Sequence, residues 1–198
     1  MRLKFLVAAT LFVSVAVAAF SQVVPAATEG PMHLQVGVGF ADYIGDLDNG
    51  RLSGGSLWVD CFPCNFPRIL HGFGVEAEAR AVRSANTLPS QIGAQQEASA
   101  GGGPTYTMTR FRRFRPYAKF DIEYGGADFN VGNPYFHHLS QVMYAPGGGI
   151  EYRAYRNIWV RADYEYQIWP HAFGGTFDLD PQGVTVGAAW EFRAPHRH

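Results

Sequence analysis

Charged residues are scarce in this sequence, and lysine is almost missing from it. Asp, Glu, Lys and Arg together make up 17% of the 198 residues, whereas about a quarter is usual in soluble domains. Lys4 and Lys119 are the only lysines, and the formal net charge is −1. A chain so balanced lacks the basic excess of a nucleic-acid-binding protein, so no nucleic-acid partner is expected. Arginine, which dominates the cations, suits buried ion pairs better than lysine does.

Long hydrophobic runs are missing beyond the amino terminus. The single run, Phe5–Phe20, follows Arg2 and Lys4 and ends in small residues, which is the layout of a secretory signal peptide. A membrane anchor is the alternative, but the run is shorter than the roughly 20 residues that span a bilayer. Because no second run exists, helical membrane spans are excluded, and a membrane-embedded mature chain has to be a β-barrel.

Two triplets fit the small-x-small rule for signal-peptide cleavage, Ala16-Val17-Ala18 and Ala19-Phe20-Ser21. The second is favoured and gives a signal peptide over residues 1–21. Its removal takes away Arg2 and Lys4 and changes the net charge from −1 to about −3. The expected organisation is then a lead segment over residues 22–31, a barrel over residues 32–192 and a short tail over residues 193–198.

Cysteine is rare as well, since Cys61 and Cys64 are the only two. A redox or metal role for this spacing needs a thioredoxin-like context or a second pair of ligands, and the sequence offers neither. We expect a local disulfide between them, or two unpaired thiols at a turn. No cofactor and no metal site is expected.

What the sequence does have is apolar residues at every second position, which is typical of strands with one apolar face. Five segments show this alternation clearly: Leu34–Phe40, Phe73–Ala81, Ala118–Tyr124, Val160–Ile168 and Val184–Phe192. Three weaker segments lie between them: Ser56–Phe62, Gly101–Thr109 and Val142–Arg153. The pattern therefore predicts an all-β fold, an eight-stranded antiparallel up-and-down transmembrane β-barrel.

The predicted links between these strands alternate in length. Short links fall near Phe111–Arg115 and Tyr155–Asn157, and longer links fall at Asp42–Gly54, Arg83–Ala98, Phe129–Ser140 and Pro170–Gln182. Short periplasmic turns that alternate with longer outer loops are typical of outer-membrane barrels.

The second face of each predicted strand carries glycine and charges of both signs. Such a face fits a narrow lumen filled by ion pairs and hydrogen bonds, because an isolated charge in a closed interior is costly. The predicted lumen network consists of Glu76, Glu78, Arg80, Lys119, Asp121, Glu123, Glu151, Arg153, Arg161, Asp163 and Glu165. The apolar face would meet lipid, and Trp159, Tyr166, Trp169 and Trp190 are interpreted as interfacial aromatic residues.

The last predicted strand, GVTVGAAWEF, resembles the carboxy-terminal insertion signal of outer-membrane barrels, with Gly187, Trp190 and Phe192 as its key residues. It departs from that signal because six residues follow the aromatic. Together with GVEAEAR, FRPYAKFDIEYG, APGGGIEYR and WVRADYEYQIW, it makes the chain resemble the outer membrane protein β-barrel domain family of diderm bacteria. This resemblance implies a small eight-stranded outer-membrane barrel, usually without a defined catalytic activity.

Two histidines and a serine lie close together in the sequence and are a candidate catalytic site. His138 and Ser140 have the His-x-Ser spacing of lipid A deacylases, and Glu151 lies downstream. The surrounding residues do not resemble that family's motif, and alternation puts His138 and Ser140 outward while Glu151 points inward. The same alternation stops His137 and His138 from sharing a metal ion. No catalytic residue is therefore expected.

The sequence thus predicts a non-enzymatic outer-membrane barrel with a structural or surface-interaction role and a largely plugged lumen. A lipid A deacylase-like enzyme and a soluble periplasmic lipocalin-like carrier are the alternatives. The expected partners are outer-membrane lipids and, during insertion, the barrel-assembly machinery. The chain is expected to act as a monomer, and the sequence leaves the ligand of its outer loops open. The basic run around Arg110–Arg115 is interpreted as a turn beside anionic head groups or peptidoglycan.

Overall fold

The chain folds into one closed β-barrel. The computed structural model describes residues 32–45, 50–63, 72–84, 93–111, 113–130, 138–172, 175 and 178–193. Within these ranges, no helix is long and apolar enough to cross a membrane.

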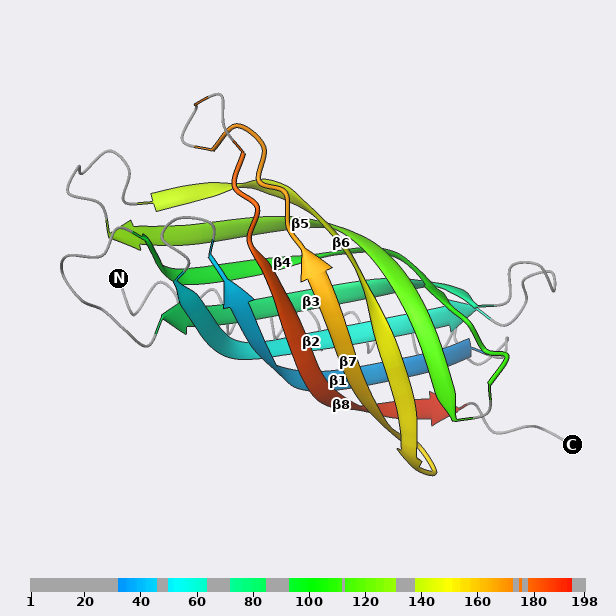
Figure 1. Cartoon of the computed structure of the whole chain (residues 1–198). Coiled ribbons are helices and arrows are strands. Elements are labelled where there is room, and N and C mark those ends of the chain that lie inside the picture. Colours follow the sequence, from blue (N-terminus) through cyan, green and yellow to red (C-terminus); the bar gives the residue numbers. More distant parts are fainter. Residues whose placement is uncertain are drawn as a thin grey trace, which may run out of the picture.

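Eight strands form the wall of the barrel, and each pairs antiparallel with its neighbours in the sequence. The last strand also pairs with the first, from His33 opposite Arg193 to Ile44 opposite Gln182, and this pairing closes the barrel (Figure 1). The strands are β1 (Met32–Ile44), β2 (Arg51–Pro63), β3 (Phe73–Ser84), β4 (Gly93–Thr107), β5 (Phe114–Asn130), β6 (His138–Tyr155), β7 (Ile158–Tyr166) and β8 (Gln182–Arg193). The predicted eight-stranded antiparallel barrel is confirmed.

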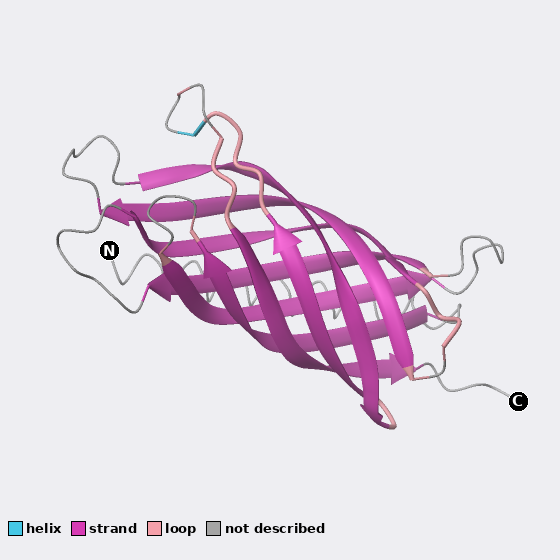
Figure 2. Cartoon of the chain, viewed as in Figure 1, coloured by secondary structure: helices cyan, strands magenta, loops and turns pink. Residues whose placement is uncertain are grey.

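The two ends of the barrel differ. At the terminal end, β1 begins, β8 ends and a turn over residues 156–157 joins β6 to β7. The opposite end, which we call the loop end, carries the connections over residues 45–50, 85–92, 131–137 and 167–181. The described parts of the last connection rise above the strands (Figure 2). In outer-membrane barrels the longer loops face outward from the cell, and the longest connection here, over residues 167–181, lies at the loop end.

Side chains alternate between the outside and the inside of the barrel, as predicted. In β3, Phe73, Val75 and Ala77 point outward, whereas Glu76 and Glu78 are buried inside. In the middle of the wall the outward set is apolar and exposed, and polar outward residues such as Asp128, His138 and Ser140 lie near the loop end. The large apolar members include Val38, Phe40, Leu57, Phe120, Ile122, Tyr124, Val142, Ile150, Val160 and Val186. This outward belt is the surface that a bilayer would cover.

Several strands extend further than the alternation predicts. The expected link over Asp42–Gly54 is wrong, because β1 continues to Ile44 and β2 begins at Arg51. The link expected at Arg83–Ala98 is likewise shortened, since β4 already begins at Gly93. Backbone hydrogen bonds between paired strands do not require apolar side chains, so the ladder continues where the alternation fades.

The interfacial interpretation of the tryptophans is wrong for two of them. Trp159 is 0% exposed and Trp169 is 1% exposed, and both lie inside the barrel, whereas Trp190 is 48% exposed on the outward face. Trp159 directly precedes the outward-facing Val160, so its own position in the alternation sends it inward. These two large aromatic side chains therefore lie in the interior of the barrel and not at the membrane interface.

Some predictions lie outside the described residues. These are the signal peptide over residues 1–21, the lead segment up to residue 31, His137 and the tail beyond Arg193. They stay predictions.

The outward belt leads to a depth-dependent expectation for charge substitutions. Ile122 lies at the middle of β5, whereas Ile44 is the last residue of β1, and both are exposed on the outward face. Ile122→Arg should lower the free energy of unfolding by about 2–4 kcal/mol, and Ile44→Arg by about 0–1 kcal/mol, because arginine is costly only near the bilayer midplane. Urea unfolding in lipid vesicles measures both values. Equal losses at the two positions would contradict a lipid-covered belt.

Candidate functional site

The interior of the barrel is the densest cluster of ionisable side chains in the described residues. The buried carboxyl groups belong to Asp60, Glu76, Glu78, Glu97, Asp121, Glu123, Glu151, Asp163, Glu165 and Glu191. The fully buried cations are Arg80, Lys119 and Arg161. Carboxyls therefore far outnumber buried cations, and each cation serves several of them.

Lys119 sits at the centre of this cluster. Its Nζ lies 3.0 Å from Oε1 of Glu76 and 2.9 Å from Oε2 of Glu165. It also donates to Glu78 and lies 3.3 Å from Oδ2 of Asp121. Lys119 is on β5, whereas Glu76 is on β3 and Glu165 is on β7. One ammonium group thus joins strands that are not neighbours in the wall.

Arg161 on β7 makes the most extensive contacts. Its guanidinium pairs with the Glu76 carboxylate through two nitrogens. Nη1 lies 2.8 Å from Oε2, and Nη2 lies 3.0 Å from Oε1. Nε donates to Asp163 at 2.9 Å and to the hydroxyl of Tyr117 at 2.5 Å. The group also lies 4.8 Å from the ring centroid of Trp58, which adds a cation–π contact. Pairing through two nitrogens fixes the orientation of the guanidinium and also strengthens its attraction to the carboxylate.

Arg80 on β3 forms a third centre, nearer the loop end. Its Nη2 lies 2.8 Å from Glu165 and 3.3 Å from Glu123, and its Nη1 donates to the Tyr43 hydroxyl at 2.5 Å. Glu165 also contacts Lys119, and Glu76 contacts both Lys119 and Arg161. Shared carboxylates therefore connect the three cations into one network, which we call the lumen network.

Two of the predicted members stand apart from the lumen network. Glu151 accepts a hydrogen bond of 2.7 Å from Nε2 of Gln35, and the described residues give it no ion pair. The Arg153 guanidinium lies 4.7 Å from the ring centroid of Trp159, toward the terminal end, and likewise has no ion pair in the described chain. The structure brings the other nine predicted residues together. Alternation predicts which face a residue takes, but not how far along the lumen its partners lie.

Several interior residues were missed by the sequence analysis. Asp60 lies 3.4 Å from Arg161, and Glu97 is buried on β4. Tyr43 and Tyr117 contribute hydroxyls to the network. Asp60 alternates with Leu57 and Val59 within the weaker strand segment, and this signal would have found it.

Four carboxyls in the interior have the spacing of a metal site. One oxygen each from Glu78, Asp121, Glu123 and Glu165 lies within 4.8 Å of the others. Lys119 and Arg80 already contact members of this group at ion-pair distance. The protein's own cations therefore supply the positive charge that such a cluster needs.

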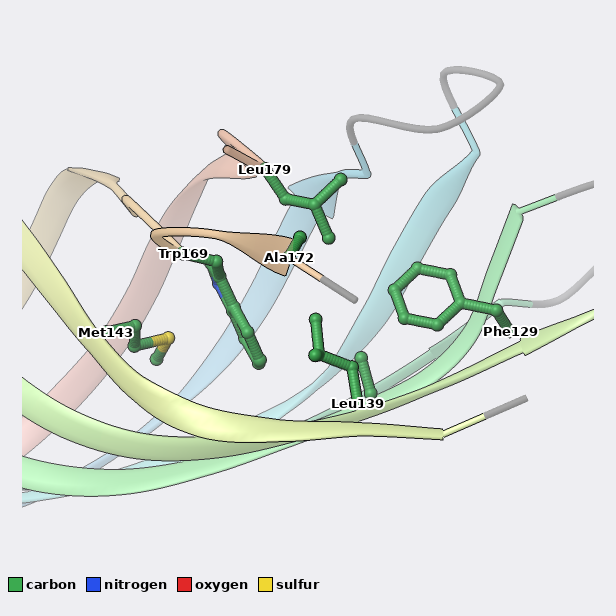
Figure 3. Close-up of a cluster of buried hydrophobic side chains, with 7 residues drawn as sticks. Phe129, Leu139, Met143, Trp169, Ala172 and Leu179 are labelled. Atoms are coloured by element: carbon green, nitrogen blue, oxygen red, sulfur yellow. The ribbon is translucent and has the colours of Figure 1, made fainter. Parts of the chain in front are cut away.

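An apolar cluster lies inside the barrel at the loop end. Trp169, Ala172 and Leu179, from the connection between β7 and β8, pack against Ala127, Phe129, Leu139 and Met143 of β5 and β6. In Figure 3 the labelled side chains point toward one another across the interior. Backbone hydrogen bonds between Ile168 and Tyr144 of β6 hold this connection against the wall, and those between Trp169 and Leu179 join its two arms. We call this cluster the apolar cap.

The remaining predicted residues lie on the wall. Trp190 and Phe192 point outward near the end of β8, and Gly187 faces inward, where a Cβ would come within 2.6 Å of the Trp58 ring. Their role in insertion stays a prediction. Cys61 lies on β2, and Cys64 lies outside the described residues, so the disulfide also stays a prediction.

The contacts of Lys119 predict that removing this cation costs more stability than removing one of the carboxylates around it. Lys119→Met should lower the free energy of unfolding by about 3–5 kcal/mol, because it leaves several buried carboxylates uncompensated. Asp121→Asn removes a carboxylate that accepts no hydrogen bond and is the most distant of the four around Lys119, at 3.3 Å, so it should cost much less stability than the loss of the lysine. Urea unfolding in vesicles gives both values. A lysine variant as stable as the wild type would mean that the lumen network does not stabilise the barrel.

Comparison with known proteins agrees with this architecture. Ail of Yersinia pestis, the attachment invasion locus protein, in complex with the heparin analogue sucrose octasulfate, superposes with a TM-score of 0.56 at 18% identity, covering 81% of this chain and 99% of Ail. Neisserial surface protein A gives 0.53 at 13% identity, covering 83% of this chain and 100% of that one. The amino-terminal β-barrel domain of Pseudomonas aeruginosa OprF gives 0.52 at 15% identity, with the same coverage of 83% and 100%. These identities are low, so the superpositions show the fold alone.

No curated protein matches the chain. The family model described as outer membrane protein beta-barrel domain matches residues 5–192, nearly the whole sequence. The closed eight-stranded wall, the apolar outward belt and the charged interior are the features that such a barrel requires. The chain therefore belongs to the family of outer membrane protein β-barrel domains.

Proposed function

We propose that this protein is a non-conducting outer-membrane barrel with a structural or surface-interaction role, which acts through its outward and loop-end surfaces. The observation that carries the proposal is the lumen network, in which Lys119 and Arg161 both contact Glu76 across the interior. Eight strands enclose an interior only wide enough for side chains, so a crosslinked interior leaves no continuous water path.

Bulky aromatic rings support the same conclusion. Trp58 is 1% exposed, and its ring occupies the space in front of Gly37, where a Cβ would overlap it. Trp159 lies toward the terminal end, where the guanidinium of Arg115 stacks 3.7 Å from its ring centroid. At the loop end, the residues of the apolar cap pack against one another inside the barrel. Packed side chains at these three levels of the barrel support the proposal of a lumen without a continuous water path.

One observation argues against the carrier alternative, and another supports a surface role. A lipocalin-like carrier needs an apolar ligand cavity inside and a polar surface outside, and here the charges are inside and the apolar side chains outside. The surface role draws on the fold neighbours as well, since one is an attachment invasion locus protein and another a surface protein. Those descriptions belong to the neighbours, and for this chain the surface role is proposed because the packed interior favours a barrel closed to solutes.

Conductance of the refolded protein in planar bilayers tests this proposal. The wild type should give no steady openings, because the ion pairs and the apolar cap leave no path. A variant with Trp169→Gly and Leu179→Gly weakens the cap alone and should also stay closed, since the lumen network remains. Replacing both Lys119 and Arg161 by alanine should produce unstable, cation-preferring leakage. Stable openings of nanosiemens size from the wild type would make the protein a pore.

A further inference from the structure

Three polar side chains form a hydrogen-bonded chain on the outward face, at the loop end of β5 and β6. Oδ1 of Asp128 lies 2.6 Å from Nδ1 of His138, and Nε2 of the same ring lies 2.7 Å from Oγ of Ser140. Asp128 and His138 are directly opposite each other in the strand pair, and Ser140 is the next residue of β6 on that face. One imidazole therefore connects a carboxylate to a serine hydroxyl.

This order of groups is the one that activates a serine as a nucleophile. In the tautomer with the proton on Nδ1, His138 donates to Asp128, and Nε2 is left to accept the proton of Ser140. The carboxylate holds the ring in place and stabilises the imidazolium that forms. The side chains of His138 and Asp128 are 62% and 52% exposed. The group is therefore accessible from outside the barrel.

We propose that Ser140, His138 and Asp128 form a hydrolytic site for acyl esters of membrane amphiphiles. Ser140 is the nucleophile, His138 is the general base and acid, and Asp128 positions the ring. Glu151, the carboxylate downstream of His138 and Ser140 in the sequence, is buried inside the barrel and cannot reach them, as its inward position in the alternation predicted. The structure supplies a different carboxylate, from the neighbouring strand.

The residue across from the serine carries no side chain. Gly126 is the residue opposite Ser140 in the strand pair. A Cβ at this position would lie 3.2 Å from Oγ of Ser140 and 3.6 Å from Cε1 of His138. The missing side chain leaves space for a carbonyl group to approach the serine oxygen from the surface of the barrel.

The position of the site on the barrel defines the class of substrate. On the same outward face, one step further from the loop end, Tyr124 and Val142 are opposite each other and exposed, and Ile122 and Tyr144 follow. The polar triad thus marks the boundary of the apolar belt. An amphiphile whose acyl chain lies along this belt, with its head group at the loop end, would present its ester carbonyl to Ser140.

The reaction needs water as its only co-reactant. Oγ of Ser140 attacks the ester carbonyl carbon, and its proton passes to Nε2 of His138. The bond from that carbon to the alcohol oxygen breaks, and the alcohol leaves with the proton from His138. Water then attacks the acyl-serine, gives a proton to His138 and releases the carboxylic acid. The proton returns to Oγ, and the site is restored.

Hydrolysis of p-nitrophenyl butyrate and p-nitrophenyl palmitate by the refolded barrel in detergent micelles tests the proposal. Ser140→Ala and His138→Gln should each lower the rate by about 10²-fold or more. Ser53→Ala is the matched control, because Ser53 also faces outward near the loop end, opposite Asp42 on β1, and it should leave the rate unchanged. Slower migration after boiling, in gels of all variants, verifies that each is folded.

Further variants test whether Asp128 positions the His138 ring for hydrolysis or only stabilises the fold. Asp128→Asn should abolish hydrolysis, whereas Asp128→Glu, which keeps a carboxylate, should restore part of it. Gly126→Ala should slow the palmitate ester more than the butyrate ester, because the added methyl group fills the approach to Ser140. A fluorophosphonate probe should attach to Ser140 in the wild type, as located by mass spectrometry, and the attachment should be lost in His138→Gln.

A folded wild type that neither hydrolyses the two esters nor attaches the probe at Ser140 would overturn this inference. So would hydrolysis that persists in Ser140→Ala. The inference goes beyond the proposed closed lumen and is independent of it: a hydrolytic barrel that conducts contradicts only the closed lumen, and an inactive barrel that does not conduct contradicts only the hydrolytic site.

Discussion

Pairing of charges away from bulk water is the constraint on which the interior of this barrel depends. The inward face carries many carboxyls, and the three fully buried cations are shared among them. Glu76 contacts both Lys119 and Arg161, and Glu165 contacts both Lys119 and Arg80. Since a buried charge without a partner is costly, each cation stabilises several carboxylates at once. Opposite walls of the barrel are thereby tied together through the lumen rather than only through the strand ladder.

The space for this network is set by pairs of large and small residues. Trp58 on β2 is directly opposite Gly37 on β1, and a side chain at Gly37 or at Gly187 would overlap its ring. The ring in turn lies against the guanidinium of Arg161. The inward-facing glycines Gly37 and Gly187 therefore leave the space that the Trp58 ring occupies. The Asp128–His138–Ser140 chain, by contrast, lies on the outward face of the barrel.

Alternation along the sequence was sufficient to predict the eight strands and the inward face of most lumen-network residues, but Trp159 and Trp169 were interpreted as interfacial although both are buried. It could not predict the strand ends, because the backbone ladder continues past the apolar positions, as at Ile44 and Arg51. It also left Glu97 in a link, since the small residues around it weaken the pattern. The place of Asp128 beside His138 depends on the register between β5 and β6. Register is set by the pairing of two strands and cannot be read from either one alone.

The coupling between Arg161 and Glu76 is the quantity on which the lumen network depends most. A double-mutant cycle of Arg161→Met and Glu76→Gln, measured by urea unfolding in lipid vesicles, isolates that pair from the other contacts. With two nitrogens of Arg161 at 2.8 and 3.0 Å from Glu76, the network predicts a coupling free energy of about 1.5–3 kcal/mol. A coupling near zero, with both single variants as stable as the wild type, would contradict the conclusion that buried ion pairs hold the interior together.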